Sequence, residues 1–164
     1  MIKVNDKLPN ATLFESTGYS EETHCPLPPQ KVDVHELTKG KKVVFFGLPG
    51  AFTPTCSGQH VPGYIKNYDA LRAKGVDEIV CLSVNDGYVM GAWGIDQKVG
   101  TKIRMLGDGQ AEFTKKLGLE TEIPGMGPRC RRFSMLVEDG VVKSINIEEK
   151  GLVVSNAETM LTQV

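Results

Sequence analysis

The sequence lacks several features that would assign it to a membrane, a nucleic acid or the cell exterior. No apolar run approaches the roughly 20 residues of a membrane span. Residues 1–6 have neither the apolar core of a signal peptide nor the arginines of a transit peptide. A net charge of −1 gives no electrostatic reason to bind nucleic acid or an anionic membrane. We therefore expect a cytoplasmic protein with no nucleic-acid partner and no membrane partner.

Short cysteine spacings and cofactor motifs are absent as well. The four cysteines, Cys25, Cys56, Cys81 and Cys130, are far apart and include no CxxC pair. A disulfide framework needs a dense set of cysteines, and a zinc site needs clustered ligands, so both are disfavoured. There is no GxGxxG motif, no Walker loop and no ligand cluster. We expect reduced cysteines with separate roles, no metal, and no haem, flavin or nucleotide cofactor.

The composition predicts one folded domain over residues 1–164. Hydrophobic residues are 40% and charged residues 24%, close to globular averages, and no repeat or linker divides the chain. The patterns predict an α/β fold with a mixed central sheet flanked by helices, compatible with a thioredoxin-like arrangement, and ending in a β-hairpin and a helix. Strands are expected at 12–15, 43–46, 78–84, 102–106, 133–137 and 141–147, and helices at 33–37, 54–73, 88–98, 110–117 and 155–161.

Local signals give these elements their boundaries. Asp33 is expected to cap its short helix, Gly40 to close it, and Ser155 to cap the last helix. The Pro62-Gly63 pair predicts a kink or break inside the helix over 54–73. The Asp139-Gly140 pair between apolar strands indicates an antiparallel hairpin.

The stretch from residue 43 to residue 56 organises the chain. A run of valines and phenylalanines, 43–46, is typical of a buried strand, and Gly47 with the Pro49-Gly50 pair ends it. Thr53 followed by Pro54 is typical of a helix cap and first helical residue, which places Cys56 in the first turn. Unpaired N–H groups and the positive end of the helix dipole favour thiolate over thiol there. We expect Cys56 to be reactive.

Three blocks of sequence resemble one family. Pro49-x-x-x-Thr53-x-x-Cys56 matches the active-site signature of peroxiredoxins. The longer run over 47–57 is similar to their type-5 (plant type II) subfamily. So are Ser83-Val84-Asn85-Asp86 with Ala92-Trp93, and Arg132-Phe133-Ser134-Met135, in the same order along the chain.

The resemblance implies a thiol peroxidase that reduces hydrogen peroxide and organic hydroperoxides and contributes to redox homeostasis and antioxidant defence. Cys56 would be the nucleophile and become a sulfenic acid. Arg132 would fix thiolate and peroxide, Thr53 would use its hydroxyl on the peroxide oxygens, and Pro49 would shield the thiolate. Two alternatives stay open. Arg132 could belong to a solvated basic trio with Arg129 and Arg131. His60, four residues after Cys56, could be a base rather than a structural or supporting residue.

The way in which the sulfenic acid is reduced again is less determined. Some type-5 members carry a resolving cysteine after the hairpin, but residues 151–156 contain none here. Cys81 matches a second cysteine of plant-type and bacterial members, although its strand predicts burial, and neither Cys130 nor Cys25 matches a resolving position. We expect a one-cysteine cycle with an external thiol, either glutathione with glutaredoxin or thioredoxin.

The resemblance also implies a homodimer that forms through loops near the active site. Candidate contacts are Phe52, Pro54 and the segments 87–91 and 124–127. Two other functions compete with the peroxidase. A thioredoxin-type oxidoreductase would need a CxxC pair, but Thr53 occupies the first position of that spacing. A redox sensor or holdase would use oxidation of Cys56 only to change partners.

Overall fold

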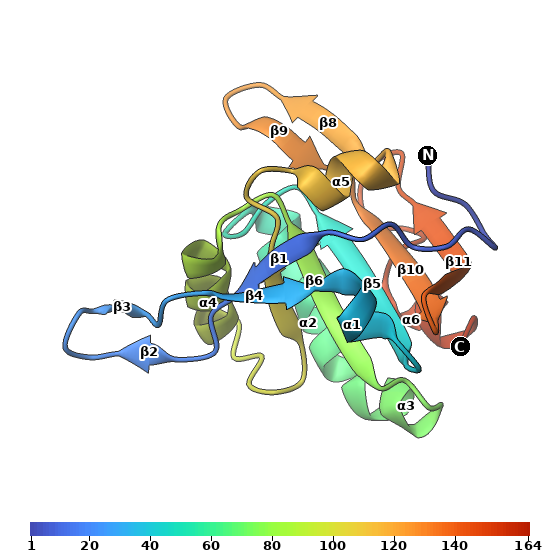
Figure 1. The fold of residues 1–164 in the computed structure, drawn as a ribbon, viewed down its shortest axis with the longest axis horizontal. Helices are drawn as coiled ribbons and strands as arrows, with labels where there is room; N and C mark the ends of the chain where they lie inside the picture. The colour runs from blue at the N-terminus through green and yellow to red at the C-terminus, as the bar shows by residue number, and fades with distance from the viewer.

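A mixed sheet of seven strands runs through the computed structural model, which describes residues 1–164 (Figure 1). The strand order is β11-β10-β5-β6-β7-β1-β4. The central β5, β6 and β7 are parallel, whereas the strands on both sides are antiparallel to their neighbours. The strands are β1 (Thr12–Glu15), β4 (Gln30–Asp33), β5 (Lys42–Leu48), β6 (Glu78–Ser83), β7 (Arg104–Gly107), β10 (Phe133–Glu138) and β11 (Val141–Ile147). The predicted mixed α/β sheet is confirmed.

Helices cover both faces of this sheet. Along β5, Val43 and Phe45 face α1 and α5, whereas Val44 and Phe46 face the other helices. A strand that is buried on both sides reads as a continuous apolar run, as residues 43–46 do. No helix has the length and apolarity needed to cross a membrane. The helices are α1 (Val34–Thr38), α2 (Val61–Lys66), α3 (Tyr68–Ala73), α4 (Gly87–Asp96), α5 (Glu112–Leu117) and α6 (Ala157–Leu161), with a π-helical turn, η1 (Cys56–His60), before α2.

Two small hairpins were not expected from the sequence. The first pairs β2 (Tyr19–Ser20) with β3 (Cys25–Pro26) and stands out from the body of the molecule (Figure 1). The second pairs β8 (Glu120–Ile123) with β9 (Gly127–Cys130). Their strands are short and polar and lack a clear apolar alternation, which is the main signal of a strand. The structure also adds β4 at the edge of the main sheet.

The predicted C-terminal hairpin is confirmed, but one predicted helix cap is wrong. Asp139 and Gly140 have φ values of 46° and 76°, as a tight two-residue turn between strands requires. The last helix is capped by Asn156, whose side chain accepts a hydrogen bond from the Thr159 N–H. Ser155, the expected cap, instead directs its N–H and hydroxyl to Glu148.

The helix predicted over 54–73 is divided, though not at the Pro62-Gly63 pair. Residues 56–60 form η1, in which the Val61 N–H reaches the Cys56 carbonyl five residues back, and the helix breaks at Asn67. Pro62 has no N–H, and its ring would crowd the carbonyl four residues earlier. Widening the preceding turn relieves that contact, so the proline acts one turn before the expected position.

Replacing Gly47 tests the packing of β5 against β10. A Cβ atom on Gly47 would overlap the ring of Phe133, its partner across the two strands. We expect Gly47→Ala to lower the free energy of unfolding by about 1 to 3 kcal/mol, measured by urea denaturation. Gly63→Ala is the matched control, since a Cβ there meets nothing within 4 Å. It should be neutral or raise stability by up to about 1 kcal/mol. Equal effects of the two substitutions would contradict this account of the packing.

Candidate active site

Cys56 lies just after the loop that connects β5 to the helices on one face of the sheet. The strand ends at Leu48, and the Ser57 N–H bonds the Thr53 carbonyl at 2.9 Å, so the helix begins at Pro54 with Thr53 in the cap position, as predicted. Cys56 is therefore in the first turn and is the first residue of η1. Its side chain is only 1% exposed. π-Helical turns are rare and often occur at functional sites, because they turn side chains away from their regular positions.

Arg132 contacts both Cys56 and His60. One guanidinium nitrogen, Nη2, donates to Cys56 Sγ at 3.2 Å, and Nη1 donates to His60 Nδ1 at 2.9 Å. Antiparallel pairing of β10 with β5 sets Phe133 opposite Gly47, which brings the start of β10 beside the end of β5. This pairing closes a separation of 76 residues between arginine and cysteine. Arg132 thus lies against the sulfur and not in solvent.

His60 is held as a neutral imidazole. Its Nε2 lies 3.1 Å from the Ser155 carbonyl oxygen, which can only accept, so Nε2 carries the proton. Nδ1 then has a free lone pair to accept from Arg132. Burial, together with the positive charge of Arg132, lowers the pKa of His60 to about 3. With its lone pair engaged and its basicity this low, His60 is not placed to deprotonate Cys56 and serves as a support for Arg132.

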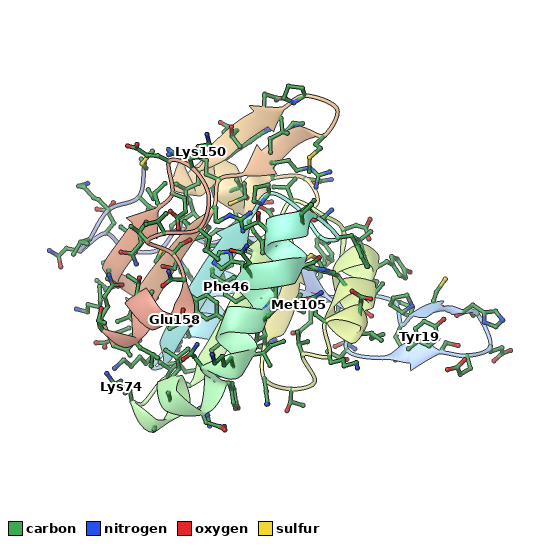
Figure 2. All side chains as sticks on the ribbon, turned by 180° about the vertical axis from the view of Figure 1, so that it is seen from behind. Tyr19, Phe46, Lys74, Met105, Lys150 and Glu158 are labelled. Carbon is green, nitrogen blue, oxygen red and sulfur yellow. The ribbon has the colours of Figure 1, made fainter.

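The far side of His60 rests on a layer of aromatic and polar groups. The Tyr64 hydroxyl also donates to the Ser155 carbonyl, at 2.9 Å, and burial raises the pKa of Tyr64. The Tyr64 ring stacks on Phe46 with centroids 4.1 Å apart. Figure 2 shows Phe46 on the sheet beneath α2. The imidazole is therefore fixed by packing as well as by its two hydrogen bonds.

The loop between β5 and the helix is fixed by polar side chains. Asn85 Oδ1 accepts from the Ala51 N–H at 3.0 Å and from the Ser83 hydroxyl at 2.6 Å. The Trp93 indole N–H donates to the Ser57 hydroxyl at 3.0 Å, which ties α4 to η1. These contacts give a structural meaning to the block at 83–86 and to Trp93, whose signal in the sequence was the family resemblance alone.

Thr53 and Pro49 lie on the same loop, each with a defined partner. The Thr53 hydroxyl donates to the Gly50 carbonyl at 2.7 Å. Because its proton is committed, its oxygen is left as an acceptor. The Pro49 carbonyl accepts from Arg129 Nη1 at 3.2 Å, so a second member of the basic trio holds the loop.

The other three cysteines have different surroundings. Cys81 lies in the middle of β6 and Cys130 at the end of β9, and both are fully buried. Burial raises the pKa of Cys81 well above its ordinary value and that of Cys130 to about 12, so both thiols are inert at neutral pH. Cys25 is exposed on the β2–β3 hairpin. No disulfide is formed, and no three His, Cys, Asp or Glu side chains gather as a metal site.

Cys56 lies in the first turn of the helix that follows a central parallel strand, and its sulfur accepts a hydrogen bond from a guanidinium. This arrangement defines the class of the protein: a cysteine-dependent oxidoreductase of thioredoxin-like fold. The Redoxin family model matches residues 3–161. The chain belongs to the Redoxin family and is a peroxiredoxin of the type-5 (plant type II) subfamily, that is, a thiol-dependent peroxidase. The alternative of a CxxC-type oxidoreductase is therefore wrong.

Relatives cover nearly the whole chain. The chain is 46% identical to Peroxiredoxin-2E, chloroplastic, of Arabidopsis thaliana over 98% of this chain and 68% of that protein. It is 44% identical to Peroxiredoxin-2B of the same plant over 98% of this chain and 96% of that protein. Among solved structures, reduced Prx3 of Vibrio vulnificus in complex with hydrogen peroxide is 48% identical, with a TM-score of 0.88 over 99% of this chain and 98% of that one.

Sequence reasoning missed two residues that support the site: Ser155, which contacts His60, and Glu148, which contacts the Arg132 backbone. Ser155 was expected only as a helix cap, and its carbonyl holds His60. Glu148 was not singled out, although its N–H donates to the Arg132 carbonyl at 2.9 Å. No motif marks either residue, because their contacts depend on the register of the C-terminal hairpin and on the fold of the following loop.

The two-pronged contact of Arg132 predicts that lysine cannot replace it. A lysine ammonium carries the same charge but lacks the planar fork that reaches the sulfur and the imidazole together. We expect Arg132→Lys to lower the second-order rate constant for hydrogen peroxide by about 100-fold, measured by stopped flow. Arg72→Lys, at an exposed position on α3, should change it by less than about two-fold, since the Arg72 guanidinium bonds neither Cys56 nor His60. A rate constant in Arg132→Lys that equals the wild-type value would show that positive charge alone, and not this geometry, matters.

Proposed function

We propose that Cys56 is the peroxidatic nucleophile of a one-cysteine cycle, assisted by Arg132, Thr53 and Pro49. The observation that carries this proposal is the 3.2 Å contact between Arg132 Nη2 and Cys56 Sγ in the first turn of a helix. A guanidinium and a helix N-terminus both stabilise a thiolate relative to a thiol. Nucleophilic attack on a hydroperoxide requires that thiolate.

The attack uses the groups around the sulfur as follows. The Cys56 thiolate forms a bond to one peroxide oxygen, and the O–O bond breaks. The sulfur keeps the attacked oxygen and its hydrogen as a sulfenic acid, and the other oxygen leaves with the bonding electron pair and takes a proton from solvent to become water or an alcohol. The Thr53 oxygen, whose own proton is given to Gly50, accepts the peroxide O–H and orients it. Arg132 N–H groups stabilise the negative charge that develops on the leaving oxygen.

Access to the sulfur is limited to small substrates. Cys56 is almost fully buried and Pro49 lies on the loop beside it, so a bulky oxidant does not reach the thiolate in this arrangement. The burial supports hydrogen peroxide and small organic hydroperoxides as substrates. It also keeps the thiolate from chance reaction with larger electrophiles.

Reduction of the sulfenic acid is assigned to an external thiol. Cys81 is held in a ladder between β5 and β7, and Cys130 is equally buried, which supports a cycle without a second cysteine of this chain. A thiol attacks the sulfenic sulfur, releases water and leaves a mixed disulfide, which a second thiol then reduces. Glutathione with glutaredoxin, or thioredoxin, would supply these thiols.

We further propose a homodimer and a cytoplasmic location. Phe52, on the active-site loop, is 56% exposed, so apolar surface lies open beside the site. Tyr88, in α4, is also exposed. The segment 87–91 is the start of α4 and not a loop, as the sequence had suggested. A protein that sediments only as a monomer at micromolar concentration would contradict the dimer.

The cysteines support the cytoplasmic location, because four free cysteines fit a reducing compartment.

Serine replacements of single cysteines test the cycle. Peroxide turnover should be abolished in Cys56→Ser and remain within about two-fold of wild type in Cys81→Ser and Cys130→Ser, because buried thiols of raised pKa do not attack. Turnover is measured separately with glutathione plus glutaredoxin and with thioredoxin. Loss of turnover in a second cysteine variant that still reacts once with peroxide would contradict the one-cysteine cycle. Rapid peroxide reaction without turnover by any thiol would leave only a sensor.

A further inference from the structure

We propose that Glu148 is a positioning residue for Arg132, acting through Ser155 and His60. Glu148 touches neither Cys56 nor the Arg132 guanidinium, yet a closed ring of hydrogen bonds joins it to both ends of the arginine. The inference rests on the proposed roles of Cys56 and Arg132. It adds a residue to the site that neither the sequence motifs nor the family comparisons mark.

The first part of the ring is a carboxylate clamp. One oxygen of Glu148, Oε2, accepts from the N–H groups of Val153, Val154 and Ser155, each at 2.8 Å, and from the Ser155 hydroxyl at 2.7 Å. The residue is 6% exposed. Burial alone would raise the pKa of Glu148, but hydrogen bonds from Ser155, Val153 and Val154 outweigh it and lower the pKa. The carboxylate is therefore charged at neutral pH and fixes the loop that carries Ser155.

The second part of the ring connects the Ser155 carbonyl, through His60, to the Arg132 guanidinium. The Ser155 carbonyl holds the proton of His60 on Nε2, so Nδ1 is an acceptor for Arg132. If the carbonyl moved away, the proton could shift to Nδ1. It would then face an Arg132 N–H, two donors would oppose each other, and the guanidinium would leave its position beside Cys56. Glu148 thus sets the histidine tautomer that Arg132 needs.

The ring closes through the backbone. The Glu148 N–H donates to the Arg132 carbonyl at 2.9 Å, and the Glu148 carbonyl accepts from Arg131 Nη2 at 3.3 Å.

The position of Glu148 opposite Arg132 depends on a β-bulge in the hairpin. Val137 pairs with Val142 but Leu136 pairs with Ser144, so Lys143 is extra, and every later residue of β11 is shifted by one. Without the bulge, Ile147 and not Glu148 would lie opposite Arg132.

Glu148→Gln is the direct test. Glutamine keeps the shape and an acceptor oxygen but loses the charge that strengthens the four hydrogen bonds. We expect the second-order rate constant for hydrogen peroxide to fall by about ten-fold. The fraction of Cys56 present as thiolate at neutral pH, read from its ultraviolet absorbance, should fall as well. Glu149→Gln removes a charge at the adjacent exposed position and should leave both quantities unchanged.

A second variant covers the case in which Glu148→Gln does not fold. Ser155→Ala removes only the hydroxyl contact and keeps the backbone N–H and carbonyl. We expect a loss of about three-fold in the same rate constant, since one of the four hydrogen bonds to the carboxylate is gone.

A double-mutant cycle distinguishes positioning from mere stability. In an Arg132→Lys background, Glu148→Gln should change the rate constant by less than about two-fold, because the guanidinium on which Glu148 acts is absent. An equal loss in both backgrounds would overturn the proposal, as would a folded Glu148→Gln protein with wild-type rate and wild-type thiolate fraction. The thiolate measurement needs no peroxide. It therefore tests Glu148 even if the proposed catalytic role of Cys56 fails.

Discussion

One guanidinium, shared between a sulfur and an imidazole, is the contact on which the rest of the site depends. Arg132 must present one nitrogen to Cys56 and another to His60, at 3.2 and 2.9 Å, and a planar fork can do so only from one direction. The sheet provides that direction. Because β10 is antiparallel to β5, Arg132, the residue before β10, lies beside the end of β5, which leads through a short loop to Cys56 in the first turn of the helix.

Only one charged side chain, that of Arg132, forms a hydrogen bond with the sulfur of Cys56. The Arg132 guanidinium is the cation hydrogen-bonded to the sulfur, since His60 is neutral and makes its contact with Arg132 through a lone pair. No buried side-chain nitrogen or oxygen lacks a hydrogen-bond partner. An unpaired polar group would cost free energy in a region of low dielectric, so the network holds the reactive geometry at little cost to stability. The preorganised groups need not move when the peroxide arrives.

Local patterns in the sequence predicted the elements that carry Cys56, whereas residues that reach it from elsewhere needed either a family resemblance or the structure. The run 43–46, the Thr53-Pro54 helix start and the Asp139-Gly140 turn all act over a few residues, and each is observed. Arg132 was known only by resemblance. Glu148 could not be found, because a β-bulge changes the register by one residue and no sequence signal marks it.

The position of the proton on His60 tests this account most directly. Nitrogen chemical shifts of the imidazole in the reduced protein report which ring nitrogen carries hydrogen, at neutral pH and again at mildly acidic pH. The account predicts a neutral ring protonated on Nε2 under both conditions, because burial and Arg132 keep its pKa far below the ordinary value. A proton on Nδ1, or a doubly protonated ring, would contradict it, since Arg132 would then have no acceptor beside Cys56.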